Sequence, residues 1–272
     1  MNTDRELLKA LELRAGVPVR MPTLSHTLMH TCGVGLSTRA PDGYVARVWT
    51  GAGWLDERYA GVWVSGTLPG GAGAPGPSAS VGCVCTTDGG ASVWGSGDLA
   101  ELLRHTSFRG LLFALVTPEG DVCDVTPTPP AGVLCALLEG LPCSLAQWLS
   151  APTPLRESWV ASAIVSRWPW PLPGADPFVV RAMEARALRH FWPVAGTCTA
   201  DTVSSQGLIG WATAWSDRQR DAVARALTTA QNVPAPQLQY RVGAARDLAA
   251  VWATFVQSGL FTQTARDLSQ VG

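Results

Sequence analysis

Two short patterns of histidine and cysteine have the spacing of metal ligands. The first is His26-x3-His30-x-Cys32, and the second is Cys83-x-Cys85, which could supply a fourth ligand to the first. A closed zinc site uses such nitrogen and sulfur donors and requires the two patterns to converge in the fold. Alternate residues of a strand point to the same side, so Cys83 and Cys85 fit equally well as small core side chains. Convergence stays an open question, and we expect no metal and no cofactor.

A cysteine nucleophile is the second chemistry that the composition allows. A catalytic thiolate needs a base beside it, and a cysteine meeting His26, His30 or His105 in a pocket would form such a pair. With seven cysteines and four histidines, many pairings exist on paper, so the sequence singles out none. It contains no Gly-x-Ser-x-Gly elbow, and its carboxylates are scattered along the chain. We therefore expect a protein that is not an enzyme, with a cysteine-dependent or zinc-dependent enzyme as the alternative.

Tryptophan is abundant, with twelve residues in the chain. Trp168 and Trp170 differ from the others because they flank prolines in a segment that has the composition of a surface loop. Exposed aromatic residues on rigid loops commonly bind partners. We therefore expect Trp168, Trp170 and Leu172 to contribute to a partner-binding surface. The alternative is that the loop folds back and both indole rings cover the core.

Composition excludes several classes of protein. The formal net charge is −1 and there is no basic block, which argues against nucleic acid as a partner. Hydrophobic residues make up 47% of the chain and charged residues 15%, which is typical of a folded protein with a core. No segment approaches the roughly 18 consecutive apolar residues of a membrane helix, and no signal peptide or lipidation motif is present. We expect a cytosolic protein with reduced thiols that meets membranes only indirectly, through a partner.

The hairpin over Thr106–Pro130 is expected to organise the fold. Its first arm, Leu111–Val116, is apolar on both faces, which predicts a strand in the middle of a sheet. Pro118 and Gly120 favour the turn. The return arm, Val122–Thr126, alternates between apolar and polar residues, as expected of an edge strand with one solvated face.

Strands are expected before this hairpin, and helices dominate after it. The expected strands, rich in Val, Trp, Thr and Cys and separated by glycine, are Thr31–Thr38, Tyr44–Thr50, Ala60–Leu68, Ser80–Thr86 and Ala91–Trp94. The expected helices, with caps or helical spacing, are Thr3–Ala15, a short one opened by Asp98, Gly132–Glu139, Ser144–Ser150, Leu155–Arg167, Phe178–Trp192, Asp217–Gln231 and Arg241–Ser258. This pattern predicts the α+β class, with a mostly antiparallel sheet from the N-terminal half that is packed and surrounded by helices from the C-terminal half. Residues 1–272 are expected to form a single compact domain.

Two short apolar motifs occur in order along the chain. The first is Ser107-Phe108-Arg109-Gly110 leading into Leu111–Val116, an acidic turn and a second strand, and it continues in the run Cys135–Pro142. The second is Gly207-Leu208-Ile209-Gly210-Trp211-Ala212. In this order and at these distances, the motifs resemble those of the herpesvirus tegument family called cytoplasmic envelopment protein 1. The similarity extends over roughly Trp94–Ala214.

This resemblance implies a non-enzymatic viral tegument protein, folded as one compact domain with a sheet surrounded by helices. It implies that the chain binds a second, smaller, palmitoylated tegument protein with a helical core. The pair would promote cytoplasmic, or secondary, envelopment and virion release. The implied locations are the virion tegument, the host cytoplasm and, through the partner, Golgi and trans-Golgi membranes. A bacterial-type immunity or effector-binding module shares the expected architecture and is a further alternative.

Overall fold

The computed structural model of the chain describes eleven segments and three isolated residues of this α+β protein. The described residues are 39, 41–66, 76–85, 91–94, 97–104, 108–127, 131–144, 147–148, 151, 159–168, 170, 177–194, 201–204 and 207–262. The expected helix Thr3–Ala15 and the expected strand Thr31–Thr38 lie outside these residues. The expectation of a single domain over residues 1–272 stays a prediction.

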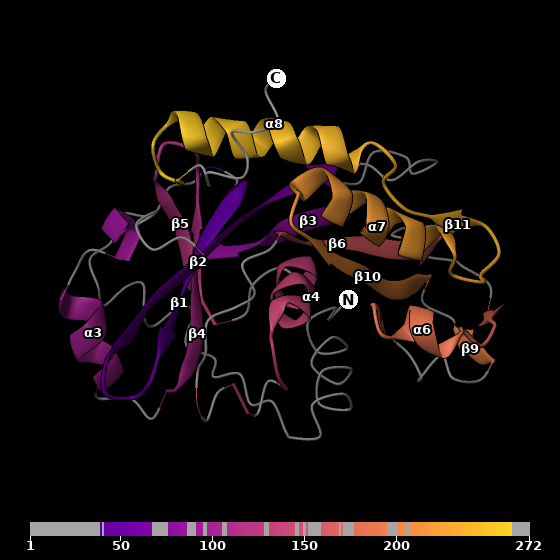
Figure 1. The fold of residues 1–272 in the computed structure, drawn as a ribbon, viewed down its shortest axis with the longest axis horizontal. Helices are drawn as coiled ribbons and strands as arrows, with labels where there is room; N and C mark the ends of the chain where they lie inside the picture. The colour runs from indigo at the N-terminus through magenta and orange to yellow at the C-terminus, as the bar shows by residue number, and fades with distance from the viewer. Residues whose placement is uncertain are drawn as a thin grey trace.

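A nine-stranded antiparallel sheet forms the centre of the structure (Figure 1). Eight of its strands follow the order β5-β4-β1-β2-β3-β6-β10-β8, and β11 pairs with β6. Their bounds are β1 Gly43–Trp49, β2 Trp54–Gly66, β3 Gly76–Cys85, β4 Gly110–Val116, β5 Val122–Thr126, β6 Trp159–Arg167, β8 Phe191–Pro193, β10 Leu208–Ser216 and β11 Leu238–Gln239. A separate pair is formed by β7, Phe178–Val180, and β9, Thr202–Ser204.

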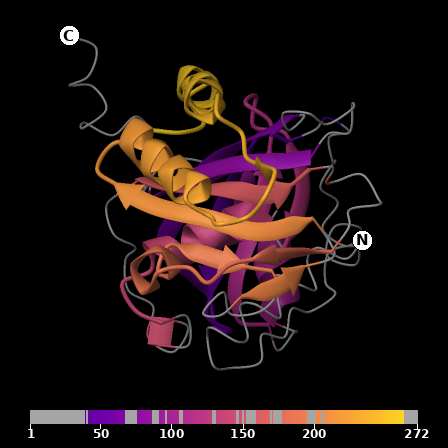
Figure 2. The same cartoon turned by 90° about the vertical axis from the view of Figure 1, so that its right-hand side faces the viewer.

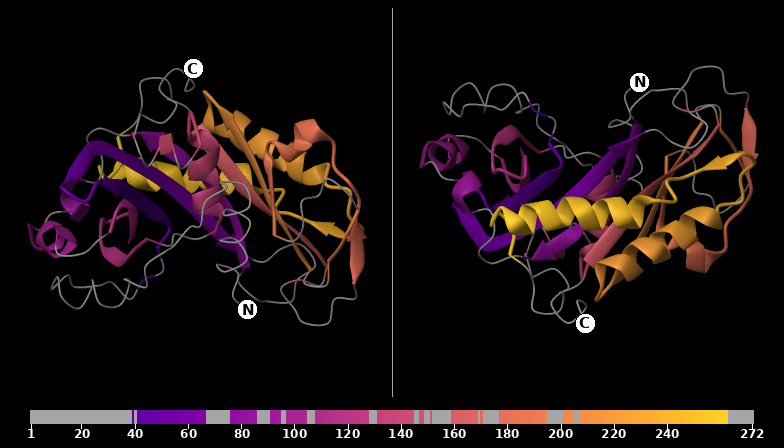
Figure 3. Two further views of the ribbon diagram at one scale, coloured as in Figure 1. Left: turned by 90° about the horizontal axis from the view of Figure 1, so that it is seen from below. Right: turned by 90° about the horizontal axis from the view of Figure 1, so that it is seen from above.

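Helices cover both faces of the sheet (Figures 2 and 3). Side chains alternate along a strand, and in β1 Tyr44 packs with Leu137 of α4 while Val45 belongs to the cluster that holds Leu248 of α8. Helix α4 therefore lies on one face, and α7 and α8 lie on the other, with α8 running across the strands (Figure 3). The helix bounds are η1 Ala91–Trp94, α3 Gly97–Arg104, α4 Ala131–Gly140, α6 Ala185–Leu188, α7 Gln219–Gln231 and α8 Ala244–Gln257.

The architecture confirms the α+β class and the expected hairpin. Strands β4 and β5 pair in antiparallel fashion, and β5 lies at the edge of the sheet, as its alternating pattern predicts. Strand β4 pairs with β1 on its other side, so it is the second strand of the sheet and not the middle one. Helices α4, α7 and α8 confirm the predictions over the same parts of the sequence.

The predicted helix over Leu155–Arg167 is wrong, because Trp159–Arg167 forms β6. Every residue of β6 except the last is buried, since β3 and β10 flank it and α4 and α7 pack on it. A strand that is covered on both faces has a continuous apolar run, and such a run does not differ in periodicity from a buried helix. The C-terminal half of the chain therefore contributes strands to the sheet as well as helices.

Two further element predictions are corrected by the structure. The predicted helix over Phe178–Trp192 is instead strand β7, the one-turn helix α6 and strand β8. The expected strand Ala91–Trp94 is a 3-10 helix. In both segments, the apolar residues are buried in a different secondary structure from the one their pattern indicated. Tertiary packing overrides weak intrinsic propensity in such cases. Within the described residues, no helix is both long and apolar enough to span a membrane.

Candidate active site

The residues expected to bind a partner occupy different environments. Trp168 has 37% of its surface exposed, whereas Trp170 is 5% exposed and packs in the cluster that contains Trp192 and Trp211. The ring of Trp170 therefore covers the core, as the alternative interpretation of this loop holds. Leu172 lies outside the described residues. Partner binding by this loop stays a prediction, and Trp168 is the member of the set that the structure places at the surface.

The structure does not place the candidate metal ligands relative to one another. His26, His30, Cys32 and His105 lie outside the described residues, and Cys83 and Cys85 fall on strand β3, whose side chains are not described. Within the described residues, no group of three or more His, Cys, Asp and Glu side chains could hold a metal ion. Convergence of the two sequence patterns therefore stays untested.

A buried carboxylate holds a histidine that directly precedes strand β8. Glu139 lies in the last turn of α4, and its side chain is 8% exposed, whereas that of His190 is 41% exposed. Glu139 Oε1 lies 2.7 Å from His190 Nδ1. A carboxylate at this depth is stable only when its oxygen atoms are hydrogen-bonded or paired, and His190 supplies one of those partners.

Two further side chains complete the hydrogen-bond network around Glu139. Thr213 Oγ1 donates to Glu139 Oε2 at 2.7 Å, and Trp192 Nε1 donates to Thr213 Oγ1 at 3.3 Å. Both carboxylate oxygens of Glu139 therefore have a hydrogen-bond partner. The Thr213 hydroxyl, which bonds to Oε2, is in turn held by the indole N–H of Trp192. Such a connected network fixes the orientation of each member more firmly than a single pair does.

The edge of the sheet positions these residues. Strand β8 pairs with β10 through Trp192 opposite Trp211, and His190 directly precedes β8. The backbone N–H of Thr213 donates to the carbonyl oxygen of His190 at 2.7 Å, which extends the ladder by one residue. Strand β10 also packs against α4, which brings Glu139 beside Thr213. His190 is therefore held both through its backbone carbonyl and through its imidazole ring.

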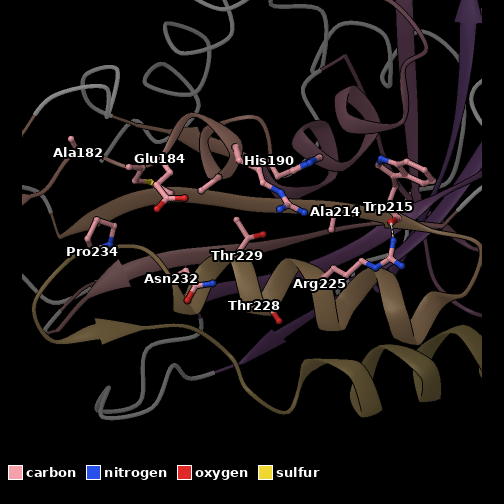
Figure 4. Close-up of a pocket in the computed structure, with 13 residues that line it drawn as sticks. Ala182, Glu184, His190, Ala214, Trp215, Arg225, Thr228, Thr229, Asn232 and Pro234 are labelled. Carbon is pink, nitrogen blue, oxygen red and sulfur yellow. Dashed lines mark hydrogen bonds between the residues drawn. The ribbon is translucent and has the colours of Figure 1, made fainter.

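A cleft of about 970 Å³ opens beside His190 (Figure 4). Its floor includes Ala214 and Trp215 of β10, beyond the point where β8 pairs with that strand. One wall is the segment before α6 together with α6 itself, and the other wall is one side of α7 (Figure 4). The volume is within the range of small-molecule sites in proteins, which is about 300–1,000 Å³.

Two hydrogen bonds fix the wall of the cleft that precedes α6. The backbone N–H of Ala182 donates to Asp201 Oδ1 at 2.8 Å, and the N–H of Arg181 donates to the carbonyl oxygen of Pro234 at 3.1 Å. The second bond ties this wall to the segment that follows α7. The two walls of the cleft are therefore joined at one end by the backbone itself.

Sequence reasoning missed both members of the carboxylate–histidine pair. Glu139 is the only charged residue in the helix Ala131–Gly140, whose other residues are apolar or glycine. A single carboxylate in an otherwise buried helix requires a partner, and that signal was available in the sequence. His190 has no comparable local signal, because its partners lie 51 residues earlier in the chain and on the neighbouring strand.

Comparison with known proteins gives matches only at the level of structure. No protein-family model matches the chain, and no curated protein matches its sequence significantly. The structure is similar to phosphoribosylamine–glycine ligase from Thermotoga maritima, with a TM-score of 0.50 and 14% identity over 74% of this chain. The match covers 55% of the ligase, so this chain spans about half the length of that protein. A biotin carboxylase domain of a single-chain bacterial carboxylase gives a TM-score of 0.48 and 12% identity over 94% of this chain and 74% of that one.

The ligase match corrects the expected function. At 14% identity the ligase match shows a similarity of fold, and the fold is one that an enzyme uses. This finding contradicts the expectations of a non-enzymatic tegument protein and of a chain that is not an enzyme. Those expectations arose from the resemblance to the tegument family and from the lack of a catalytic motif in the sequence, whereas Glu139 and His190 meet only in the fold. The resemblance to the herpesvirus family and the expected partner and locations are not tested by these matches and stay predictions.

Proposed function

We propose that the protein is an enzyme in which His190 transfers a proton to or from a small molecule held in the cleft. The observation that carries this proposal is the contact of 2.7 Å between Glu139 Oε1 and His190 Nδ1, made by a buried carboxylate to a histidine that lines a cleft. A positioned histidine is the most common general acid or base in enzymes. A carboxylate that orients it is the recurrent second part of such sites.

The chemistry of the pair follows from the donors and acceptors present. An ionised Glu139 can only accept hydrogen bonds, so His190 Nδ1 carries a proton, and in the neutral imidazole Nε2 keeps its lone pair. Nε2 is then the atom that takes a proton from a bound substrate. The imidazolium that results is stabilised by the Glu139 carboxylate and can return the proton in a later step. The hydrogen bond from Thr213 keeps Glu139 in the orientation that this exchange requires.

The comparison with solved structures supports an enzyme with small polar substrates. The ligase is named for phosphoribosylamine and glycine, which are small molecules of the size that the cleft accommodates. The cleft walls present arginine, threonine, asparagine and glutamate side chains, which suit such substrates. Substrate identity in this chain is set by its own side chains and not by the fold.

A turnover screen with a histidine variant tests this proposal. The purified full chain is incubated with a panel of small amines, carboxylates and phosphate esters, and products are detected by mass spectrometry. We expect wild-type turnover of at least one member, and a loss of about 10²–10⁴-fold in His190→Ala, since that is what general acid–base catalysis contributes. Val242→Ser, at an exposed position away from the cleft, serves as the control and should retain full activity. Equal turnover by His190→Ala and wild type, or no product from any panel member, contradicts the proposal.

A further inference from the structure

One side of helix α7 carries a polar stripe that faces the cleft. The cleft is lined by Arg225 and by three residues that lie three, four and seven positions after it, namely Thr228, Thr229 and Asn232 (Figure 4). Side chains at these spacings lie on one face of a helix. Buried residues of α7, such as Ala222 and Ala226, pack on the sheet instead. The helix therefore offers one face to the core and a different face to whatever occupies the cleft.

The guanidinium of Arg225 is anchored at the rim of the cleft. Its Nη1 donates to the carbonyl oxygen of Trp215 at 3.1 Å, as the dashed line in Figure 4 shows. Arginine has five N–H donors in a planar group, so this contact holds the side chain while leaving donors for a ligand. A guanidinium fixed in this way matches the two oxygen atoms of a carboxylate or a phosphate. Anchoring also reduces the conformational entropy lost when a ligand binds.

The charges that line the cleft favour an anion. Arg186 of α6 lines the wall that faces α7, and among the described residues its side chain has no hydrogen bond or ion pair. The lining carries one carboxylate, that of Glu184, and the carboxylate of Glu139 is occupied by His190 and Thr213. Two guanidinium groups therefore oppose one exposed carboxylate.

We infer that the cleft binds its substrate through a carboxylate or phosphate group, held by Arg225 and attracted by Arg186, with the rest of the molecule beside His190. This inference deepens the proposed function and rests on it for the role of His190. Arg225 and Arg186 bind the anionic group, and His190 exchanges the proton. The two roles belong to different residues, so binding and turnover can be lost separately.

Binding of simple anions to the full-length protein tests the inference directly. Inorganic phosphate is one probe and acetate is the other, so the two arms distinguish a phosphate site from a carboxylate site. The readout is the nuclear magnetic resonance signal of the His190 ring, which is assigned by its absence in His190→Gln. We expect saturable shifts of this signal with at least one probe in the millimolar range.

Three variants decide whether the cleft charges cause the binding. Arg225→Gln should weaken binding about tenfold or more, since it removes a charge-assisted hydrogen bond. Arg220→Gln, on the same helix and outside the cleft lining, changes the net charge equally and should leave the affinity unchanged. Glu184→Gln removes the opposing carboxylate and should strengthen binding severalfold. Circular dichroism and thermal unfolding confirm that each variant is folded.

Several outcomes overturn the inference. They are an absence of saturable shifts with both probes, equal weakening by Arg225→Gln and Arg220→Gln, and weaker binding in Glu184→Gln. If anions bind as expected but the protein shows no turnover, the inference is supported. The same result contradicts the proposed enzymatic role of His190. Turnover that depends on His190 but not on Arg225 removes the inference and leaves the proposed function standing.

Discussion

Glu139 and His190 are 51 residues apart in the sequence, yet Glu139 Oε1 lies 2.7 Å from His190 Nδ1. Helix α4 supplies the carboxylate from one face of the sheet, and the start of strand β8 supplies the imidazole at the sheet edge. Thr213 of β10 contacts both residues, through its hydroxyl to Glu139 and through its backbone N–H to His190. One residue of the sheet therefore couples the positions of the two side chains.

The first prediction concerns that coupling. If Glu139 acts by orienting His190, Glu139→Gln lowers kcat/KM about 10²-fold, because the amide no longer fixes the tautomer or stabilises the imidazolium. The double variant Glu139→Gln/His190→Ala should be no less active than His190→Ala alone, since residues that act as one unit are not additive. Steady-state kinetics of the three variants measures this. Additive losses in kcat/KM would mean that Glu139 acts independently of His190.

The second prediction concerns Gly210, which allows β8 to approach β10. A Cβ atom at this position would lie 2.3 Å from the carbonyl oxygen of Trp192 and 2.8 Å from Cζ of Phe191. The backbone atom cannot move without shifting β8, so Gly210→Ala should lower the free energy of unfolding by about 1–3 kcal/mol. The shift of β8 should also displace His190 and reduce turnover.

Gly53→Ala is the matched control for this variant. A Cβ atom at Gly53 has no neighbouring atom within 4 Å, so this change should leave both stability and turnover close to wild type. Urea unfolding followed by circular dichroism measures both variants. Equal stability of Gly210→Ala and Gly53→Ala would show that β8 is not packed against Gly210 as described.

The third prediction concerns the attachment of α8 to the sheet. The ring of Trp252 is buried, with its centroid 4.6 Å from that of Trp159 on β6 and 5.0 Å from that of Phe261. Trp252→Ala should lower the free energy of unfolding by about 3–5 kcal/mol, because a large buried side chain is replaced by a cavity. Val242→Ser, at a residue 68% exposed, should change it by less than about 0.5 kcal/mol. Urea unfolding again provides the measurement, and a small effect of Trp252→Ala would contradict the described packing of α8.

The fourth prediction concerns pH and the start of α8. The hydrogen bond from Arg241 Nη2 to Asp247 Oδ2, at 2.5 Å, lowers the pKa of Asp247 from its ordinary value of 3.8. A lowered pKa in the folded state means that the pair stabilises the protein above pH 3.8 and that this contribution is lost as pH falls through the folded-state pKa. Asp247→Asn should therefore be less stable than wild type at neutral pH, and the difference should shrink as the pH falls below 3.8. A difference that is constant over this range would exclude ionisation of Asp247 as its cause.

The elements that local patterns specify were predictable from the sequence. The β4–β5 hairpin has a turn marked by Pro118 and Gly120, and Gly120 adopts a positive φ of 91° in the structure. Helices α7 and α8 each have one apolar side, which gives a helical period in the sequence. For these elements, the chemistry of neighbouring residues determines the conformation.

Strand β6 and the candidate active site could not be predicted in the same way. Strand β6 is buried on both faces, so its sequence has no alternation that would separate it from a buried helix. Trp170 enters the core because Gly207, at a positive φ of 75°, lies against its side chain from a distant part of the sequence. His190 gains its role from α4 and β10, which the sequence near residue 190 does not reveal. In each case the deciding contact is long-range.

Because β8 is only three residues long, its pairing with β10 could differ between molecules of one preparation. Three residues pair β8 with β10, with Phe191 opposite Ala212 and Pro193 opposite Gly210. Side chains alternate along a strand, so a slip by a single residue would turn the imidazole toward the opposite side of the sheet. Such molecules would be folded yet would lack the contact between Glu139 and His190, so a preparation could contain two populations with different signals of the His190 ring.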